Sequence, residues 1–217
     1  YINPTSKQYF AFNIWNIESA KAIIDAASIL QHSIILQTSM AAFEVLDKEE
    51  LRAFITCYMK KRNIQVYLHL DHCKRMEFIE SAICCGWDSV MIDASEKSVE
   101  ENIMLTNEVC AASKGRDVLV EAEIGQICSV EDKIEEGANI ARIEDVEKFI
   151  RNTDIDMLAV AIGTSHGCYQ ESPKLHYDLI EKVALLSDIP VVIHGGTGLT
   201  DKMLIQLLSY KNIKKIN

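Results

Sequence analysis

Eight short apolar runs, rich in β-branched residues, recur along this 217-residue chain and limit its fold more than any other feature. Such runs are typical of parallel strands that are buried on both faces by covering helices. We therefore predict eight parallel strands, at residues 9–15, 33–39, 66–72, 89–95, 118–124, 157–164, 190–196 and 213–217.

Amphipathic stretches separate these runs, and their apolar residues recur at helical spacing. Strands that alternate with helices indicate an α/β fold. Eight of them fit a (β/α)8 TIM barrel better than the alternative, an open doubly wound sheet, because no glycine-rich turn follows the first strand. The expected helices cover residues 17–30, 46–61, 76–85, 99–113, 143–152, 175–186 and 201–209.

The length of the chain and the absence of any linker composition predict a single TIM-barrel domain over residues 1–217. A complete barrel of this kind typically needs about 250 residues. We therefore expect a barrel that is truncated at the start of strand 8, with the C-terminal end missing.

Charge and cysteine content exclude several classes of partner. The 32 acidic and 22 basic side chains give a net charge of −10, which disfavours nucleic acid and anionic membrane surfaces. The short basic clusters at residues 60–62 and 214–215 are interpreted as solvated ends of helices or strands. Seven cysteines, with no two-residue spacing and no apolar leader, predict a reduced, cytoplasmic protein that spans no membrane.

Polar side chains gather where the predicted strands end. In a barrel these ends meet on one rim, which is where the active sites of such folds lie. We expect the chemistry of this chain to lie among Asn13, Ser39, Asp71, His72, Asp93, Glu121, Glu123, His166, His194 and Asn217.

Three histidines, His72, His166 and His194, follow three different strands. Three neutral imidazoles can hold a divalent metal and leave positions open for a substrate. The alternative is three unrelated histidines, each hydrogen-bonded to a nearby carbonyl. Their common rim and the carboxylates beside them favour the metal site.

The carboxylates next to these histidines admit more than one role. Asp71 is suited to general acid–base catalysis, or it orients a histidine. Asp93 and Glu123 either ligate a second metal position or brace the ligands of the first. The glycine-rich turn HGGTG at residues 194–198 is suited to binding phosphate at the mouth of strand seven, although such glycines also make ordinary tight turns.

Six ordered blocks resemble the class II, metal-dependent fructose-bisphosphate and tagatose-bisphosphate aldolases. They are LHLDH at 68–72, SVMIDAS at 89–95, EAEIG at 121–125, AIGTSHG at 161–167, HGGTG at 194–198 and KIN at 215–217. The resemblance runs from about residue 11 to the last residue.

The resemblance implies a zinc-dependent lyase in which His72, His166 and His194 hold one catalytic Zn²⁺. It also implies a second divalent metal position at Asp93 and Glu123, with Asp71 as the catalytic acid–base. Glu131 matches the loop glutamate that abstracts the substrate proton. Dihydroxyacetone phosphate and its precursor would be held by residues matching Asn13, Ser39, Gly167, Gly195, Gly196, Thr197 and Asn217.

The implied reaction is reversible cleavage of fructose 1,6-bisphosphate into dihydroxyacetone phosphate and glyceraldehyde 3-phosphate, by a homodimer or homotetramer. A tagatose-1,6-bisphosphate aldolase and a non-catalytic sugar-phosphate-binding relative are the alternatives, and a different metal-dependent barrel such as a hydrolase is disfavoured. The chain departs from the family pattern at Cys128–Ser129, at 40–43 and at Gln170. The first of these places usually carries two glycines, which allow the loop to close.

Overall fold

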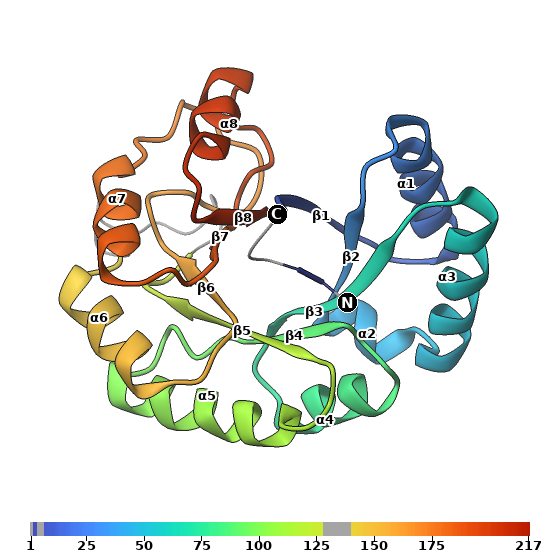
Figure 1. The fold of residues 1–217 in the computed structure, drawn as a ribbon, viewed down its shortest axis with the longest axis horizontal. Coiled ribbons are helices and arrows are strands. Elements are labelled where there is room, and N and C mark those ends of the chain that lie inside the picture. Colours follow the sequence, from blue (N-terminus) through green and yellow to red (C-terminus); the bar gives the residue numbers. More distant parts are fainter. Residues whose placement is uncertain (1, 4–6, 128–139) are drawn as a thin grey trace.

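Eight parallel strands close into a barrel in chain order, and the computed structural model describes residues 2–3, 7–127 and 140–217. The barrel closes where Tyr9 and Phe10 of the first strand pair with Lys215 and Ile216 of the last. The strands, at the centre of Figure 1, are β1 (Tyr9–Asn13), β2 (Ile34–Ser39), β3 (Val66–Cys73), β4 (Ser89–Ile92), β5 (Leu119–Ile124), β6 (Met157–Val160), β7 (Val191–Ile193) and β8 (Ile213–Ile216).

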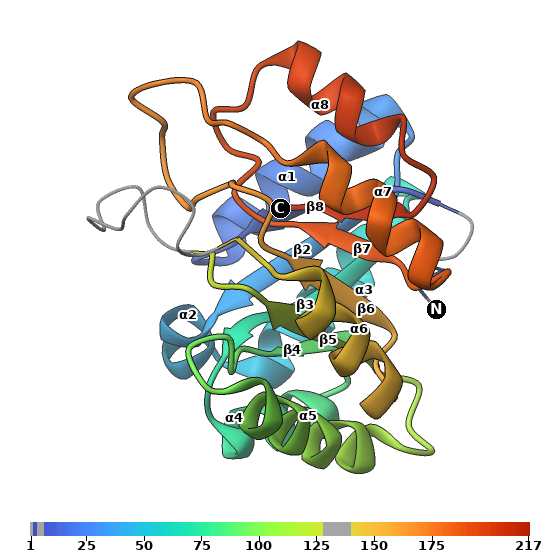
Figure 2. The same ribbon diagram turned by 90° about the vertical axis from the view of Figure 1, so that its left-hand side faces the viewer.

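Helices form an outer ring around these strands (Figure 1). Neighbouring helices pack together, as α4 and α5 do in both Figure 1 and Figure 2. The helices are α1 (Ile17–Leu30), α2 (Met40–Val45), α3 (Lys48–Arg62), α4 (Met76–Cys84), α5 (Val99–Ser113), α6 (Ile143–Asn152), α7 (Tyr177–Leu186) and α8 (Asp201–Leu208). In the parts of the chain that the structure describes, no helix is both long and apolar enough to cross a bilayer.

The alternation of side chains along each strand divides the apolar residues into two cores. Outward-facing residues such as Leu68, Val90 and Val120 pack against the helices. Inward-facing residues fill the interior of the barrel with a smaller cluster: Ile2, Tyr9, Ala11, Ile35, Tyr67, Met91, Leu119, Met157, Ala159 and Val192. This inner apolar cluster fills the barrel near the starts of the strands. Polar residues occupy the space at the carboxyl ends.

The α/β alternation and the barrel predicted from the sequence are confirmed. One helix was not predicted: α2 lies directly after β2, where the sequence analysis placed no element until residue 46. Six residues are too few to show a helical period, but the signal at its start is present. The Ser39 hydroxyl accepts a hydrogen bond from the Ala42 amide and caps the helix.

We predict that Phe43→Ala lowers the free energy of unfolding by about 3–5 kcal/mol, because it opens a cavity in a packed aromatic cluster. Phe43 is 1% exposed, and its ring centroid lies 5.3 Å from that of Trp87 and 5.5 Å from that of Phe78. Leu185→Ala is the control, since Leu185 is 88% exposed. Urea denaturation measures both variants, and equal losses would contradict the packing described.

Candidate active site

Asp71 and His72 are adjacent in β3, yet both point into the site at the carboxyl end of the barrel. In a regular strand, neighbouring side chains face opposite sides of the sheet. Here the register of β3 against β4 shifts between Leu70 and Cys73, and His72 has a φ of +47°. Such a bulge turns a side chain to the other face, and a left-handed conformation at a non-glycine residue is often found where function requires it.

His72 and His194 face each other through their ring nitrogens, and His166 stands beside them. His72 Nε2 lies 2.9 Å from His194 Nδ1. The centroid of the His166 ring is 4.6 Å from that of His72 and 5.9 Å from that of His194. His72 comes from β3, His194 follows β7 directly, and His166 lies in the loop after β6. One ring nitrogen of each lies within 4.8 Å of the others.

Asp93 binds His72 on its other side, and Glu123 lies nearby. Asp93 Oδ2 lies 2.9 Å from His72 Nδ1, and Glu123 Oε2 lies 3.8 Å from it. Burial lowers the pKa of His72, but Asp71, Asp93 and Glu123 outweigh it and raise that pKa to about 9. Burial raises the pKa of Glu123 to about 8. The pocket therefore favours a positive charge at its centre.

Asp71 lies at the floor of the site and is held by two amide side chains. Its Oδ2 accepts a hydrogen bond from Gln37 Nε2 at 3.0 Å, and its Oδ1 is 3.4 Å from Asn217 Nδ2. Burial raises the pKa of Asp71, but His72, His194 and other nearby groups lower it more. The net effect keeps its pKa below the ordinary value, so the carboxylate is ionised near neutral pH.

The residues present fit a divalent metal. His166 Nε2 and Glu123 Oε2 are buried, and neither has a hydrogen-bond partner among the described residues. Buried polar atoms are rarely left without a partner, so each points to a ligand that would satisfy it. Imidazole nitrogens are common zinc ligands. Among the described residues, two groups have donor atoms close enough together to hold an ion. One is His72, His166 and His194, and the other is His72, Asp93 and Glu123.

A cavity of about 410 Å³ opens beside Asp71 and is lined by most of the residues predicted to hold substrate. Gly195 and Gly196 lie on its wall, and close packing explains why they are glycines. A Cβ on Gly196 would lie 2.7 Å from the Asn217 carbonyl oxygen. The lining includes Asn13, Gln37, Asp71, His166, Gly167, Gly195, Gly196, Thr197 and Asn217.

Tyr169 joins two of the loops around this cavity. Its hydroxyl donates to the Gly195 carbonyl at 2.7 Å and accepts from the Ser165 amide at 2.8 Å. The loop that carries His166 and the turn that carries His194 are therefore tied together. The sequence analysis assigned Tyr169 no role.

Among the residues predicted to bind substrate, Ser39 alone does not line this cavity. Ser39 ends β2 beside Asp71 in the strand register, and its hydroxyl caps α2, so its contact with substrate stays a prediction. Glu131, together with the substituted pair Cys128–Ser129, lies outside the described residues.

The sequence analysis was wrong about Lys215. Its cluster with Lys214 was expected to be solvated, yet Lys215 is buried and its ammonium group contacts Glu121 inside the barrel. The register of β8 against β7 shifts between Ile213 and Lys215, and this irregularity places Lys215 opposite Val192 of the barrel interior while Lys214 stays half-buried. The sequence analysis also missed Gln37. The available signal was that Gln37 lies two residues before Ser39 and therefore on the same face of the strand.

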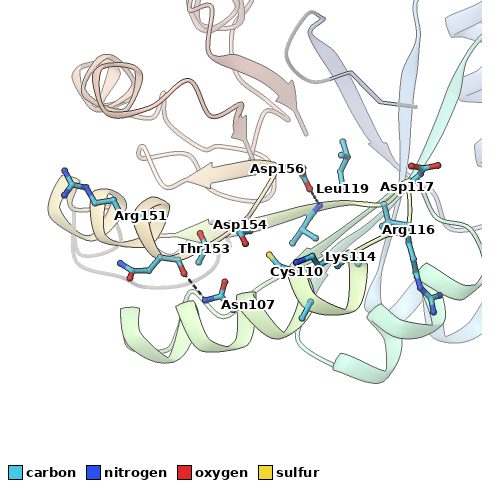
Figure 3. Close-up of a pocket in the computed structure, with 15 residues that line it drawn as sticks. Asn107, Cys110, Lys114, Arg116, Asp117, Leu119, Arg151, Thr153, Asp154 and Asp156 are labelled. Carbon is cyan, nitrogen blue, oxygen red and sulfur yellow. Dashed lines mark hydrogen bonds between the residues drawn. The ribbon is translucent and has the colours of Figure 1, made fainter.

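A second cavity, of about 760 Å³, lies at the starts of β5 and β6, at the opposite end of these strands from the site (Figure 3). Its polar groups are used by the local backbone: Asn107 Nδ2 donates to the Asn152 carbonyl, and Asp156 Oδ2 accepts from the Val120 amide. Burial raises the pKa of Cys110 to about 11, so its thiol stays protonated.

Comparison with known proteins agrees with this geometry. Residues 5–217 match the family model described as "Fructose-bisphosphate aldolase class-II". A fructose-bisphosphate aldolase of Giardia intestinalis is 36% identical over 193 residues, which cover 87% of this chain and 60% of that protein. The chain thus spans about 60% of the length of this curated relative.

Solved structures give the same fold. The YdjI aldolase of Escherichia coli K12 superposes with a TM-score of 0.82 at 29% identity, covering 99% of this chain and 77% of that one. The fructose-bisphosphate aldolase of Campylobacter jejuni, at 23% identity, shares the fold with a TM-score of 0.76 over 97% of this chain and 70% of that one. Because the family model covers nearly the whole sequence, the chain belongs to the class II fructose-bisphosphate aldolase family.

Proposed function

We propose that this chain forms the catalytic barrel of a zinc-dependent class II aldolase that cleaves fructose 1,6-bisphosphate reversibly. The products are dihydroxyacetone phosphate and glyceraldehyde 3-phosphate. The observation that carries the proposal is the convergence of His72, His166 and His194 at the carboxyl end of the barrel, next to the buried carboxylate of Asp71. Family membership supports the same reaction class.

His72, His166 and His194 would hold the catalytic zinc ion through one ring nitrogen each. Bound zinc acts as a Lewis acid, polarising the substrate ketone and stabilising the negative charge that develops on its oxygen when the bond is cleaved. Asp93 orients His72, and Asp93 and Glu123 together would provide ligands for a second divalent ion.

Asp71 is placed to move the proton that the reaction requires. In cleavage it would accept the proton of the C4 hydroxyl, and in condensation it would return that proton to the aldehyde oxygen. The amides of Gln37 and Asn217 fix the direction of its carboxylate. Glu131 stays the predicted base at the dihydroxyacetone phosphate carbon.

The turn at Gly195, Gly196 and Thr197 would hold a phosphate group of the substrate. Backbone amides and a threonine hydroxyl at this rim can donate to phosphate oxygens without bringing a positive side chain. This arrangement reconciles a phosphorylated substrate with the net charge of −10. Gly167 and Asn13 border the same cavity and would contact the rest of the sugar phosphate.

Two alternatives keep the same site. A tagatose-1,6-bisphosphate aldolase would differ only in the stereochemistry that the sugar end of the cavity accepts, which turnover of both ketoses distinguishes. A non-catalytic relative would bind dihydroxyacetone phosphate but would not exchange the protons of its hydroxymethyl carbon. A cytoplasmic location and a homodimeric or homotetrameric assembly stay predictions, which gel filtration and fractionation would test.

Removal of metal should abolish the cleavage of fructose 1,6-bisphosphate, and added zinc should restore it, because no imine-forming lysine is part of the proposed site. Coupled assays of triose phosphate release before and after EDTA treatment measure this. Cleavage that survives chelation, or an imine trapped by borohydride, would contradict the proposal.

Replacing Asp71 should separate proton transfer from metal binding. Asp71→Ala and the isosteric Asp71→Asn are both expected to lower kcat by about 10²–10⁴-fold while still binding zinc, because neither side chain can accept the proton. Asp156→Asn, in the cavity at the opposite end of the strands, is the control and should keep kcat. Turnover unchanged in both Asp71 variants would remove Asp71 from its role.

Gly195→Ala should lower kcat/KM by more than the strain of a left-handed backbone alone would explain. Gly195 and Gly115 both have left-handed backbones, with φ of +71° and +77°, so alanine costs about 1–2 kcal/mol at either position. At Gly195 the added Cβ also meets the Ser165 amide nitrogen at 2.9 Å, whereas nothing lies within 4 Å at Gly115. We expect kcat/KM to fall about 10²-fold for Gly195→Ala and to be retained in Gly115→Ala. Equal kcat/KM values in the two variants would contradict the role of the turn.

A further inference from the structure

Glu121 of β5 and Lys215 of β8 form an ion pair inside the barrel. Lys215 Nζ donates to Glu121 Oε2 at 2.8 Å, and the two side chains are 1% and 0% exposed. Burying two charges removes them from water, so a pair of this kind contributes little net stability compared with apolar residues of similar size. What Glu121 does with its second oxygen suggests a different role.

The second oxygen of Glu121 holds a candidate metal ligand. Glu121 Oε1 lies 2.8 Å from His194 Nε2. A carboxylate only accepts hydrogen bonds, so the proton of neutral His194 belongs on Nε2 and the lone pair on Nδ1. Nδ1 is the nitrogen that faces His72 across the site, at 2.9 Å. Glu121 thus selects the tautomer that a metal needs.

Lys215 keeps Glu121 charged and in place. The Lys215 ammonium group donates to Glu121 Oε2 at 2.8 Å and stabilises the ionised carboxylate, which leaves Oε1 to accept from His194. His69 does not replace Lys215 as a partner: its Nε2 lies 3.7 Å from Glu121 Oε2, too far for a good hydrogen bond. Burial also lowers the pKa of His69 to about 3, which leaves it uncharged.

We infer that Glu121 and Lys215 are positioning residues of the metal site, in which Lys215 fixes Glu121 and Glu121 presents Nδ1 of His194 to the ion. The inference rests on the proposed zinc function and deepens it. Loss of the carboxylate that accepts a hydrogen bond from the far N–H of a ligating histidine commonly lowers metal affinity or activity by about 10–100-fold. Both residues act through His194, and neither lines the cavity beside Asp71.

Two double variants separate this role from a merely structural one. Both remove the ion pair and keep similar side-chain volumes. Glu121→Gln/Lys215→Met leaves an oxygen that can accept from His194, whereas Glu121→Met/Lys215→Met leaves none. We expect the second variant to lose about 10–100-fold in zinc affinity and the first to lose clearly less. Competition with a chromogenic chelator measures the affinity.

The visible spectrum of the cobalt(II)-substituted protein provides a second readout, since it reports the ligands around the ion. It should change in the Met/Met variant and stay close to wild type in the Gln/Met variant. Thermal unfolding of the metal-free proteins checks the fold. Should a double variant fail to fold, Glu121→Gln with Lys215 retained takes its place, and we expect weaker zinc binding there too.

Arg52→Met/Asp88→Asn is the matched control. This pair has the same 2.8 Å nitrogen–oxygen distance but lies outside the barrel interior, away from the histidines. It should change stability without changing zinc affinity. Wild-type zinc affinity in both Glu121/Lys215 double variants would overturn the positioning role and leave the proposed function standing. A wild-type protein that binds no zinc would overturn the proposed function itself.

Discussion

A closed barrel requires every polar side chain in its interior to find a partner there. The lower interior is apolar, and the polar residues begin above it with Lys215 and Glu121. Glu121 holds His194, which lies beside His72 and Asp71, and Asp71 and His166 line the cavity. The carboxyl end of the barrel carries more acidic than basic side chains, which is why a cation belongs at its centre.

The strands and their order were predictable because strands buried on both faces in an α/β barrel leave a repeated apolar signal in the sequence. The strand order predicted that His72, His166 and His194 would lie on one rim, since the carboxyl ends of parallel strands meet there. Helix α2 was missed because it has only six residues, which show no period.

Other features depend on contacts that no local pattern shows. Lys215 looks like part of a surface cluster until the strand face that carries it is known, and its partner lies 94 residues earlier in the chain. Strict alternation would place His72 on the helix side of β3, away from Asp71. Only the residue types suggested that the two act together, and the bulge that makes this possible is a property of the folded strand.

The left-handed backbone at His72 limits how this position can change. Asparagine, aspartate and glycine adopt such a conformation at low cost, whereas β-branched residues are strained there. If His72 is exchanged, aspartate or asparagine could therefore offer an oxygen donor without rebuilding the strand. In the proposed metal site, the backbone shape at His72 thus permits an oxygen donor in place of a nitrogen donor.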